Sequence, residues 1–274
     1  MGTIGNHKDV IAIVLVFLLA VIFEYLEAFS LIEDETLSYR QILRTHYADP
    51  ELTSPSEDIL IVFTDEEFYG EYDKYPLRRV DLSTVIVRLK EMGAAVIGVD
   101  MLLDFNSAYG EDPTLEDALR VAGNVLLVSQ AEFKGNEFVT MNTAIPRFHE
   151  LTEPGYSNIS PNSAISESLV RLHVYPEIGE LDAWPFAVKA VSMLVGAEPE
   201  LIGGALVIGD DIEVGLDQFH EFYIDYPLLP SGRDGTARLH EVIGMSVSDI
   251  LFVEDEEELE DLAFLVDGKI VLIG

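Results

Sequence analysis

Residues 81–100, DLSTVIVRLKEMGAAVIGVD, carry two different apolar periodicities within one short stretch of the chain. In the first half, apolar side chains recur every three or four residues, at Leu82, Val85, Ile86 and Leu89. This spacing predicts a helix over residues 81–92 with one buried face and with Asp81 as its N-terminal cap. Gly93 predicts the end of that helix, and residues 95–99 form a continuous apolar run typical of a strand buried on both faces.

The segments on either side of this stretch continue the same alternation. A buried strand is predicted before it at Ile59–Thr64, and a short helix at Leu115–Val121 and a strand at Asn124–Ser129 are predicted after it. This order of elements favours parallel strands joined by right-handed crossovers. Farther along, the sequence predicts a helix over residues 182–195, followed by strands at 205–208, 211–214 and 221–226. A short helix near 246–252, an acidic connector and a closing strand at 269–273 complete the prediction. We therefore expect an α/β domain with a mixed, largely parallel sheet flanked by helices.

The N-terminal region contains 14 uninterrupted apolar residues, Val10–Phe23. A signal-peptide core, a membrane anchor and a buried helix are the three interpretations. The possible cleavage site at Ala28 has Leu26 where a small residue is required, which favours an uncleaved transmembrane helix. Lys8 before the span favours a cytoplasmic N-terminus, so the rest of the chain would lie outside the cytoplasm. The expected domains are a stub and anchor over residues 1–32, a juxtamembrane helix and linker over 33–58, and a folded domain over 59–274.

The composition excludes several classes of function. The chain has 16 Lys and Arg residues and 50 Asp and Glu residues, a formal net charge of −34. A charge of this size repels phosphate backbones, so nucleic acid is not an expected partner. There is no cysteine, which excludes disulfides, thiolate metal sites and a cysteine nucleophile. His173, His220 and His240 are too scattered to predict a metal site, and no metal or cofactor is expected.

Two carboxylates follow predicted strands. Asp65 follows the first strand and Asp100 follows the second, so both would project at the carboxyl edge of a parallel sheet, where open α/β sheets bind ligands. Arg79, just before the predicted helix, could reach this edge and pair with either carboxylate. Asp65, Arg79 and Asp100 are the candidate ligand-binding residues, and a structural ion-pair network is the alternative interpretation of the same residues.

Signatures of common enzymes do not occur in the sequence. It has no G-x-S-x-G, H-E-x-x-H, P-loop or G-x-G-x-x-G pattern. The acidic segment Asp104–Asp112 does not follow the EF-hand ligand pattern, because Ala108 stands where a carboxylate is needed. We therefore expect no catalytic residue, and the enzyme alternative is a carboxylate- or metal-dependent extracytoplasmic hydrolase that uses Asp65 and Asp100.

Several short segments occur in an order that resembles the type-two CHASE domains. The resemblance covers the region after the apolar segment and rests on these stretches: ILIVFTD at 59–65, YPLRR at 75–79, GAAVIGVD at 93–100, EDAL at 116–119, GNV at 123–125, IDY at 224–226, SVSDIL at 246–251 and GKIVLIG at 268–274. Tyr75 and Leu77 stand where the family has tryptophan, and its central D-x-D-G-x-x-R element is matched only by Asn162 and Arg171.

The resemblance implies an extracytoplasmic sensor module of the kind found in bacterial membrane-bound nucleotide cyclases and histidine kinases. It implies no reaction by this chain itself. The implied partners are membrane lipid around the N-terminal helix, an unknown small ligand or ion, a second copy of the chain in a homodimer, and an effector module located in a longer form of the same chain or in a partner protein.

Overall fold

This computed structural model describes residues 7–25, 36, 55–72, 74–134, 137–158, 171–174, 177–178, 181–217, 220–224, 228–229, 238–239, 243–253 and 255–274. Most of the predicted juxtamembrane helix and linker lies outside these residues, as do Asn162 and the pair Asp225 and Tyr226. The chain divides into two units. The first comprises residues 1–53, 160–171 and 224–239, and contains helix α1 (His7–Tyr25) and the small hairpin β13 (Leu228–Leu229) and β14 (Arg238–Leu239).

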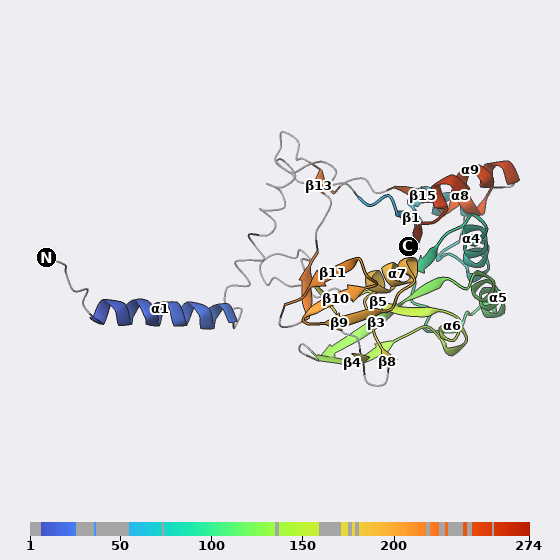
Figure 1. Cartoon of the computed structure of the whole chain (residues 1–274). Helices are drawn as coiled ribbons and strands as arrows, with labels where there is room; N and C mark the ends of the chain where they lie inside the picture. The colour runs from blue at the N-terminus through green and yellow to red at the C-terminus, as the bar shows by residue number, and fades with distance from the viewer. Residues whose placement is uncertain are drawn as a thin grey trace. The chain divides into compact units, whose positions relative to one another are not determined.

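The second unit holds the central sheet, in which β15, β1, β3, β4 and β5 are labelled in Figure 1. Its strands run in the order β15-β1-β16-β2-β3-β4, with β5 also paired to β3. These strands are β1 (Ile59–Phe63), β2 (Val96–Val99), β3 (Val125–Lys134), β4 (Glu137–Asn142), β5 (Glu153–Tyr156), β15 (Gly244–Ser246) and β16 (Ile270–Ile273). Every pairing is parallel except that of β3 with β4. The predicted mixed, largely parallel sheet is therefore confirmed.

Strand β16, the last in the chain, occupies an interior position in the sheet. Ile270 pairs with Ile59 of β1 on one side and with Val96 of β2 on the other. Its residues Ile270, Val271 and Ile273 are buried, as expected for a strand covered on both faces. The first and second strands are consequently not neighbours, because the closing strand separates them.

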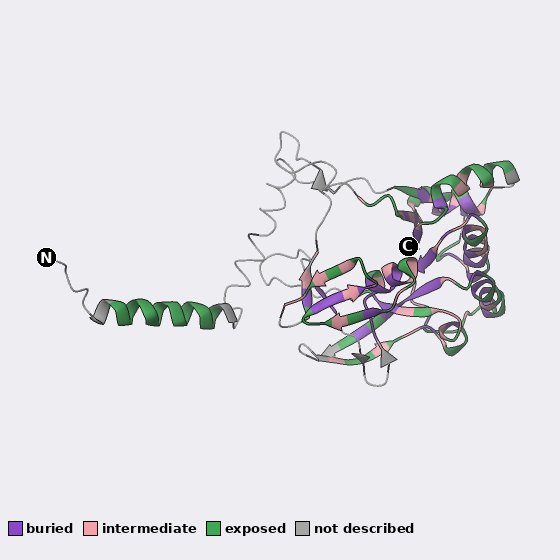
Figure 2. Cartoon of the chain, viewed as in Figure 1, coloured by how far each residue is buried: buried purple, intermediate pink, exposed green. Residues whose placement is uncertain are grey.

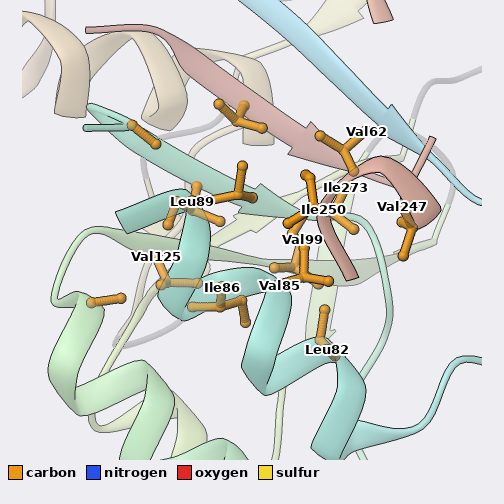
Figure 3. Packing of buried hydrophobic residues seen from close by; sticks show 14 of the residues in the cluster. Val62, Leu82, Val85, Ile86, Leu89, Val99, Val125, Val247, Ile250 and Ile273 are labelled. Carbon is orange, nitrogen blue, oxygen red and sulfur yellow. The ribbon is translucent and has the colours of Figure 1, made fainter. Parts of the chain in front are cut away.

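One face of the sheet packs against helices α4 (Arg79–Glu91), α5 (Asp112–Ala122) and α8 (Ser248–Leu251). Figure 3 shows Leu82, Val85, Ile86 and Leu89 of α4 meeting side chains from β1, β2, β3 and β16. These are the residues whose spacing predicted the helix. The burial pattern in Figure 2 follows this layer, with purple strands beneath helices whose outer sides are exposed.

The other face is covered in part by α7 (Phe186–Val195). Phe186 approaches two glycines: an added Cβ on Gly155 would lie 2.6 Å from the Phe186 Cα, and one on Gly98 would lie 2.8 Å from the Phe186 ring. The missing side chains of these glycines therefore allow α7 to lie close to β2 and β5. The remaining helices of this unit are α3 (Glu66–Tyr72), α6 (Pro146–His149) and α9 (Glu256–Val266). Its remaining strands are β6 (Arg171–His173), β7 (Glu177–Ile178), β8 (Leu181–Asp182), β9 (Pro199–Ile202), β10 (Ala205–Ile208), β11 (Ile212–Gly215) and β12 (Glu221–Tyr223). The first residue of β6, Arg171, is assigned to the first unit.

Two local predictions were wrong. Helix α4 begins at Arg79, its N-cap is Arg78, and no side chain caps it, so Asp81 lies inside the first turn. The segment predicted as an acidic connector forms α9, which is capped by the Asp255 carboxylate accepting from the Glu257 backbone N–H at 3.0 Å. The cluster of acidic residues in its first turns concealed a helical apolar spacing at Leu259, Leu262, Ala263 and Val266.

In helix α1 the large apolar side chains are exposed, between 44% and 69% each, from Val10 to Phe23. Among the described residues, no helix combines the length and the apolarity that crossing a membrane requires.

Candidate functional site

The structure places Asp65 and Asp100 at the same edge of the sheet, because β1 and β2 run parallel to β16 between them. Gly274 lies at this edge between the two strand ends. Its carbonyl oxygen accepts from the Thr64 N–H at 3.0 Å, and the carbonyl oxygen of Ile273 accepts from the Asp100 N–H at 2.8 Å. Two strand spacings separate β1 from β2, about 10 Å in all. The two carboxylates therefore flank a strand and do not form a contact pair.

Asp65 caps helix α3. Its Oδ1 accepts from the Phe68 N–H at 2.7 Å, and its backbone carbonyl accepts from the Tyr69 N–H at 3.1 Å. A carboxylate that binds the first free amides of a helix lowers the free energy of the folded state. Sequence reasoning missed α3, although an aspartate placed directly after a strand is itself a helix-start signal.

Asp100 is exposed at the end of β2. Its side chain makes no hydrogen bond or ion pair within the part of the chain that the structure describes. A side chain added to Gly274 would come within 3.7 Å of the Asp100 Cβ, so this carboxylate stands directly beside the end of β16. Asp65 and Arg79 each bind another group of the domain, so of the three predicted residues Asp100 is the one whose side chain stays available to a ligand.

Arg79 is 7% exposed and does not pair with Asp65 or Asp100. Its Nη1 donates to Asp112, and its Nη2 donates to the carbonyl oxygen of Phe105 at 2.5 Å. The guanidinium also lies 5.3 Å from the centre of the Phe105 ring and 5.4 Å from that of Phe148. The predicted pairing was wrong because the first residue of α4 faces the start of α5 and the β2–α5 loop.

Arg78 forms a second link to the start of α5. Its guanidinium pairs with Glu111 and lies 4.3 Å from the centre of the Tyr109 ring. Its backbone N–H donates to the Tyr72 hydroxyl at 3.0 Å, and that hydroxyl donates to Asp81. Burial, and then the hydrogen bond with Asp81, raises the pKa of Tyr72 well above its usual value, so the tyrosine keeps its proton as a donor.

Glu111 and Asp112 are the partners that sequence reasoning missed. Both are buried, at 8% and 6% exposure, and Asp112 also accepts from the Ser107 N–H at 3.1 Å. The hydrogen bond with Glu111 raises the pKa of Arg78. A usable signal existed: two acidic residues at the start of one crossover helix match two arginines at the start of its neighbour. These four residues form what we call the arginine–acid network: Arg78, Arg79, Glu111 and Asp112.

Among the described residues, no group of three or more His, Asp and Glu side chains is placed so that it could hold a metal ion. His173 is buried, and its Nε2 pairs with Glu221 Oε1 at 2.5 Å. The Tyr156 hydroxyl donates to the carbonyl oxygen of His173 at 2.6 Å. This histidine thus takes part in a buried polar contact between β6 and β12.

A comparison with protein families matches residues 11–274 to the CHASE2 domain. A search of curated proteins and a search of solved structures each returned no match.

Proposed function

Because this chain belongs to the CHASE2 domain family, an extracytoplasmic sensory family, we propose that it is the ligand-responsive input part of a membrane-anchored signalling protein. The family match over nearly the whole chain is the observation that supports this function. CHASE2 domains occur in cyclases and kinases, so the proposed effector is a nucleotide cyclase or a histidine kinase. That effector would belong to a longer form of the chain or to a partner protein.

The proposed sensing surface is the carboxyl edge of the sheet, with Asp100 as the residue that contacts the ligand or ion and Asp65 beside it. The carboxylate of Asp100 supports this choice because it is exposed and pairs with no described residue, as does the general use of this edge for ligands in open α/β sheets. The burial and pairing of Arg79 favour a supporting role in place of direct contact. A ligand at this edge would transmit a signal only if it bound two arrangements of the domain with different affinity.

Thermal unfolding of the full chain in the presence of Ca²⁺, Mg²⁺, nucleotides and small metabolites tests this proposal. A ligand that binds the folded state at 100 times its dissociation constant adds about 2.7 kcal/mol to the free energy of unfolding and raises the midpoint. Asp100→Ala is expected to abolish the increase. Asp261→Ala, which removes an exposed carboxylate on α9, is the matched control and is expected to keep it. The edge is not a ligand site if every stabilising compound acts equally on wild type and Asp100→Ala.

Membrane anchoring through the N-terminal segment 1–32 is a second part of the proposal, although its described helix α1 does not by itself reach the length and apolarity of a membrane-spanning helix. Apolar side chains exposed on all sides of this helix support contact with lipid, since water is a poor solvent for such a surface. Lys8 near its start favours a cytoplasmic N-terminus and an extracytoplasmic main domain.

Alkaline carbonate extraction of cell membranes measures this anchoring. We expect the wild-type chain to stay in the membrane pellet and Leu15→Arg/Leu18→Arg to move to the supernatant, because each arginine in a helix centre opposes insertion by about 2.5–3.5 kcal/mol. Val121→Arg, on the exposed surface of α5, is the control that should stay in the pellet. Release of the wild-type chain by carbonate would contradict anchoring.

The hydrolase alternative requires Asp65 and Asp100 to act as a pair, and no contact between described residues brings these two carboxylates together. Asp65 is engaged with α3, and a strand lies between the two carboxylates. A homodimer and contact with lipid remain proposed partnerships, and the net charge of −34 continues to disfavour nucleic acid.

A further inference from the structure

Helices α4 and α5 lie side by side on one face of the central sheet (Figure 1). A groove of about 430 Å³ opens to solvent between them, and its lining is mostly apolar. Val80 is 38% exposed and Val121 is 67% exposed, and Val87 and Ala118 line the groove with them. Apolar surface in a groove between two helices suits the side chains of another protein surface. We call this feature the α4–α5 groove.

The two helices that form the groove carry little net charge. Helix α4 has three basic and two acidic residues, a net charge of +1, and α5 has one basic and three acidic residues, a net charge of −2. The whole chain carries −34 over 274 residues, or about −3 for a segment as long as these two helices together. Two copies of so acidic a chain repel each other over most of their surface, and this face opposes their approach least.

Helix α9 provides the contrast. It also presents a large apolar side chain to solvent, since Phe264 is 86% exposed. However, α9 has five acidic residues and no basic residue, so a second copy of α9 would meet it with the same negative charges. Exposed apolar surface is combined with a nearly neutral charge on α4 and α5, and this combination does not occur on α9.

The opposite signs of the two net charges suit a two-fold symmetric dimer. In such a dimer the same surface of both copies is in contact, and with the axis parallel to the helices α4 of each copy faces α5 of the other. A net charge of +1 then meets a net charge of −2 twice. Lys90 on α4 and Asp117 on α5 are both exposed, and Lys90 forms no ion pair with a described residue. The apolar groove supplies the driving force when it is withdrawn from water, and these charges favour the two-fold arrangement.

From these observations we propose that the α4–α5 groove is the surface through which two copies of this chain form a two-fold symmetric dimer. The homodimer thereby gains a defined interface. This interface uses neither Asp65 nor Asp100, the residues proposed for sensing at the carboxyl edge. It is therefore independent of the proposed sensory function, and either can fail without the other.

Crosslinking of single-cysteine variants of the full chain tests the interface. The natural chain has no cysteine, so an introduced thiol is the one site at which a bismaleimide can react. We expect most of the Val121→Cys protein in mild detergent to become a covalent dimer with a short bismaleimide, because this residue lines the groove. Val139→Cys places the thiol on β4, where Val139 is 58% exposed, and is the matched control that should stay monomeric.

Val121→Glu tests the same surface without crosslinking. Because Val121 is 67% exposed, the change leaves the core intact, but a dimer would bury two new carboxylates in an apolar groove. Sedimentation equilibrium in density-matched detergent should show self-association weakened by at least about tenfold, whereas Val139→Glu should behave as the wild type does. Lys90→Glu should also weaken the dimer, and adding Asp117→Lys should restore part of the loss, because the helices again have opposite tendencies.

Three outcomes would overturn the proposal. The first is a wild-type chain that sediments as a monomer. The second is equal crosslinking of Val121→Cys and Val139→Cys, or a dimer that Val121→Glu leaves unchanged, since the contact would then lie elsewhere. The third is a monomer in which the Val121→Cys thiol resists maleimide, because another segment of the same chain would then cover the groove.

Discussion

Deletion of residues 269–274 is expected to leave the second unit without a stable fold. Strand β16 pairs with β1 on one side and with β2 on the other, so its loss removes two parallel ladders from the middle of the sheet. It also removes three buried apolar side chains, each contributing about 1.5–3 kcal/mol. That sum approaches the 5–15 kcal/mol that commonly stabilises a whole domain. Circular dichroism and limited proteolysis of the truncated chain check this result.

A point substitution gives the graded version of the same experiment. Ile273 is fully buried in β16, and Ile273→Ala is expected to lower the free energy of unfolding by about 2–5 kcal/mol in urea titrations. Ile202 of β9 is 55% exposed, so Ile202→Ala is the matched control and should change stability much less. A truncated chain that keeps a cooperative unfolding transition of wild-type size would contradict the interior role of β16.

Arg79→Ala is expected to lower the free energy of unfolding by about 3–5 kcal/mol, because it leaves the Asp112 carboxylate buried without its partner. The same change removes a donor to the Phe105 carbonyl and contacts with two aromatic rings. Arg120→Ala removes an exposed arginine that pairs with Glu116 and Asp117, and it should have little effect.

A double-mutant cycle with Asp112→Ala distinguishes the network from a ligand-contact role for Arg79. If the ion pair dominates, the double variant should lose much less stability than the two single variants lose together. The reason is that the double variant lacks both charges, so no buried charge is left without a partner. Strict additivity, or an Arg79→Ala protein with full stability and altered ligand response, would return Arg79 to the sensing surface.

The regular part of the fold could be predicted because burial imposes simple periods. Residues 96–99 and 270–273 have the continuous apolar runs of strands covered on both faces, and α4 has the three- and four-residue spacing of a helix with one buried side. The apolar run 59–63 also forms a strand, but only Leu60 and Val62 on one of its faces are buried, and Phe63 is 39% exposed. The order of strands in the sheet was not predictable in this way. Each of these runs is compatible with any interior position, so only the packing reveals that the last strand lies between the first two.

The candidate site was partly predictable for a related reason. Strand direction places Asp65 and Asp100 at one edge, and this follows from the sequence once the sheet is taken as parallel. The partner of Arg79 depends on which helix lies beside α4, and this is a contact between segments about 30 residues apart along the chain. Local preference therefore identified the charged residues, whereas tertiary packing determined their pairing with Glu111 and Asp112.

The place of β16 also has a consequence for how the chain folds during synthesis. Strands β1 and β2 leave the ribosome early, but the strand that joins them is the last to appear, and Ile59 meets Ile270 across almost the whole length of the domain. At about 5–20 residues per second, the facing edges of β1 and β2 wait roughly 10–35 s for their common partner. Long-range contacts of this kind slow folding and leave apolar strand edges open to other chains. Translation speed and chaperone binding during that interval are thus expected to govern the yield of folded protein.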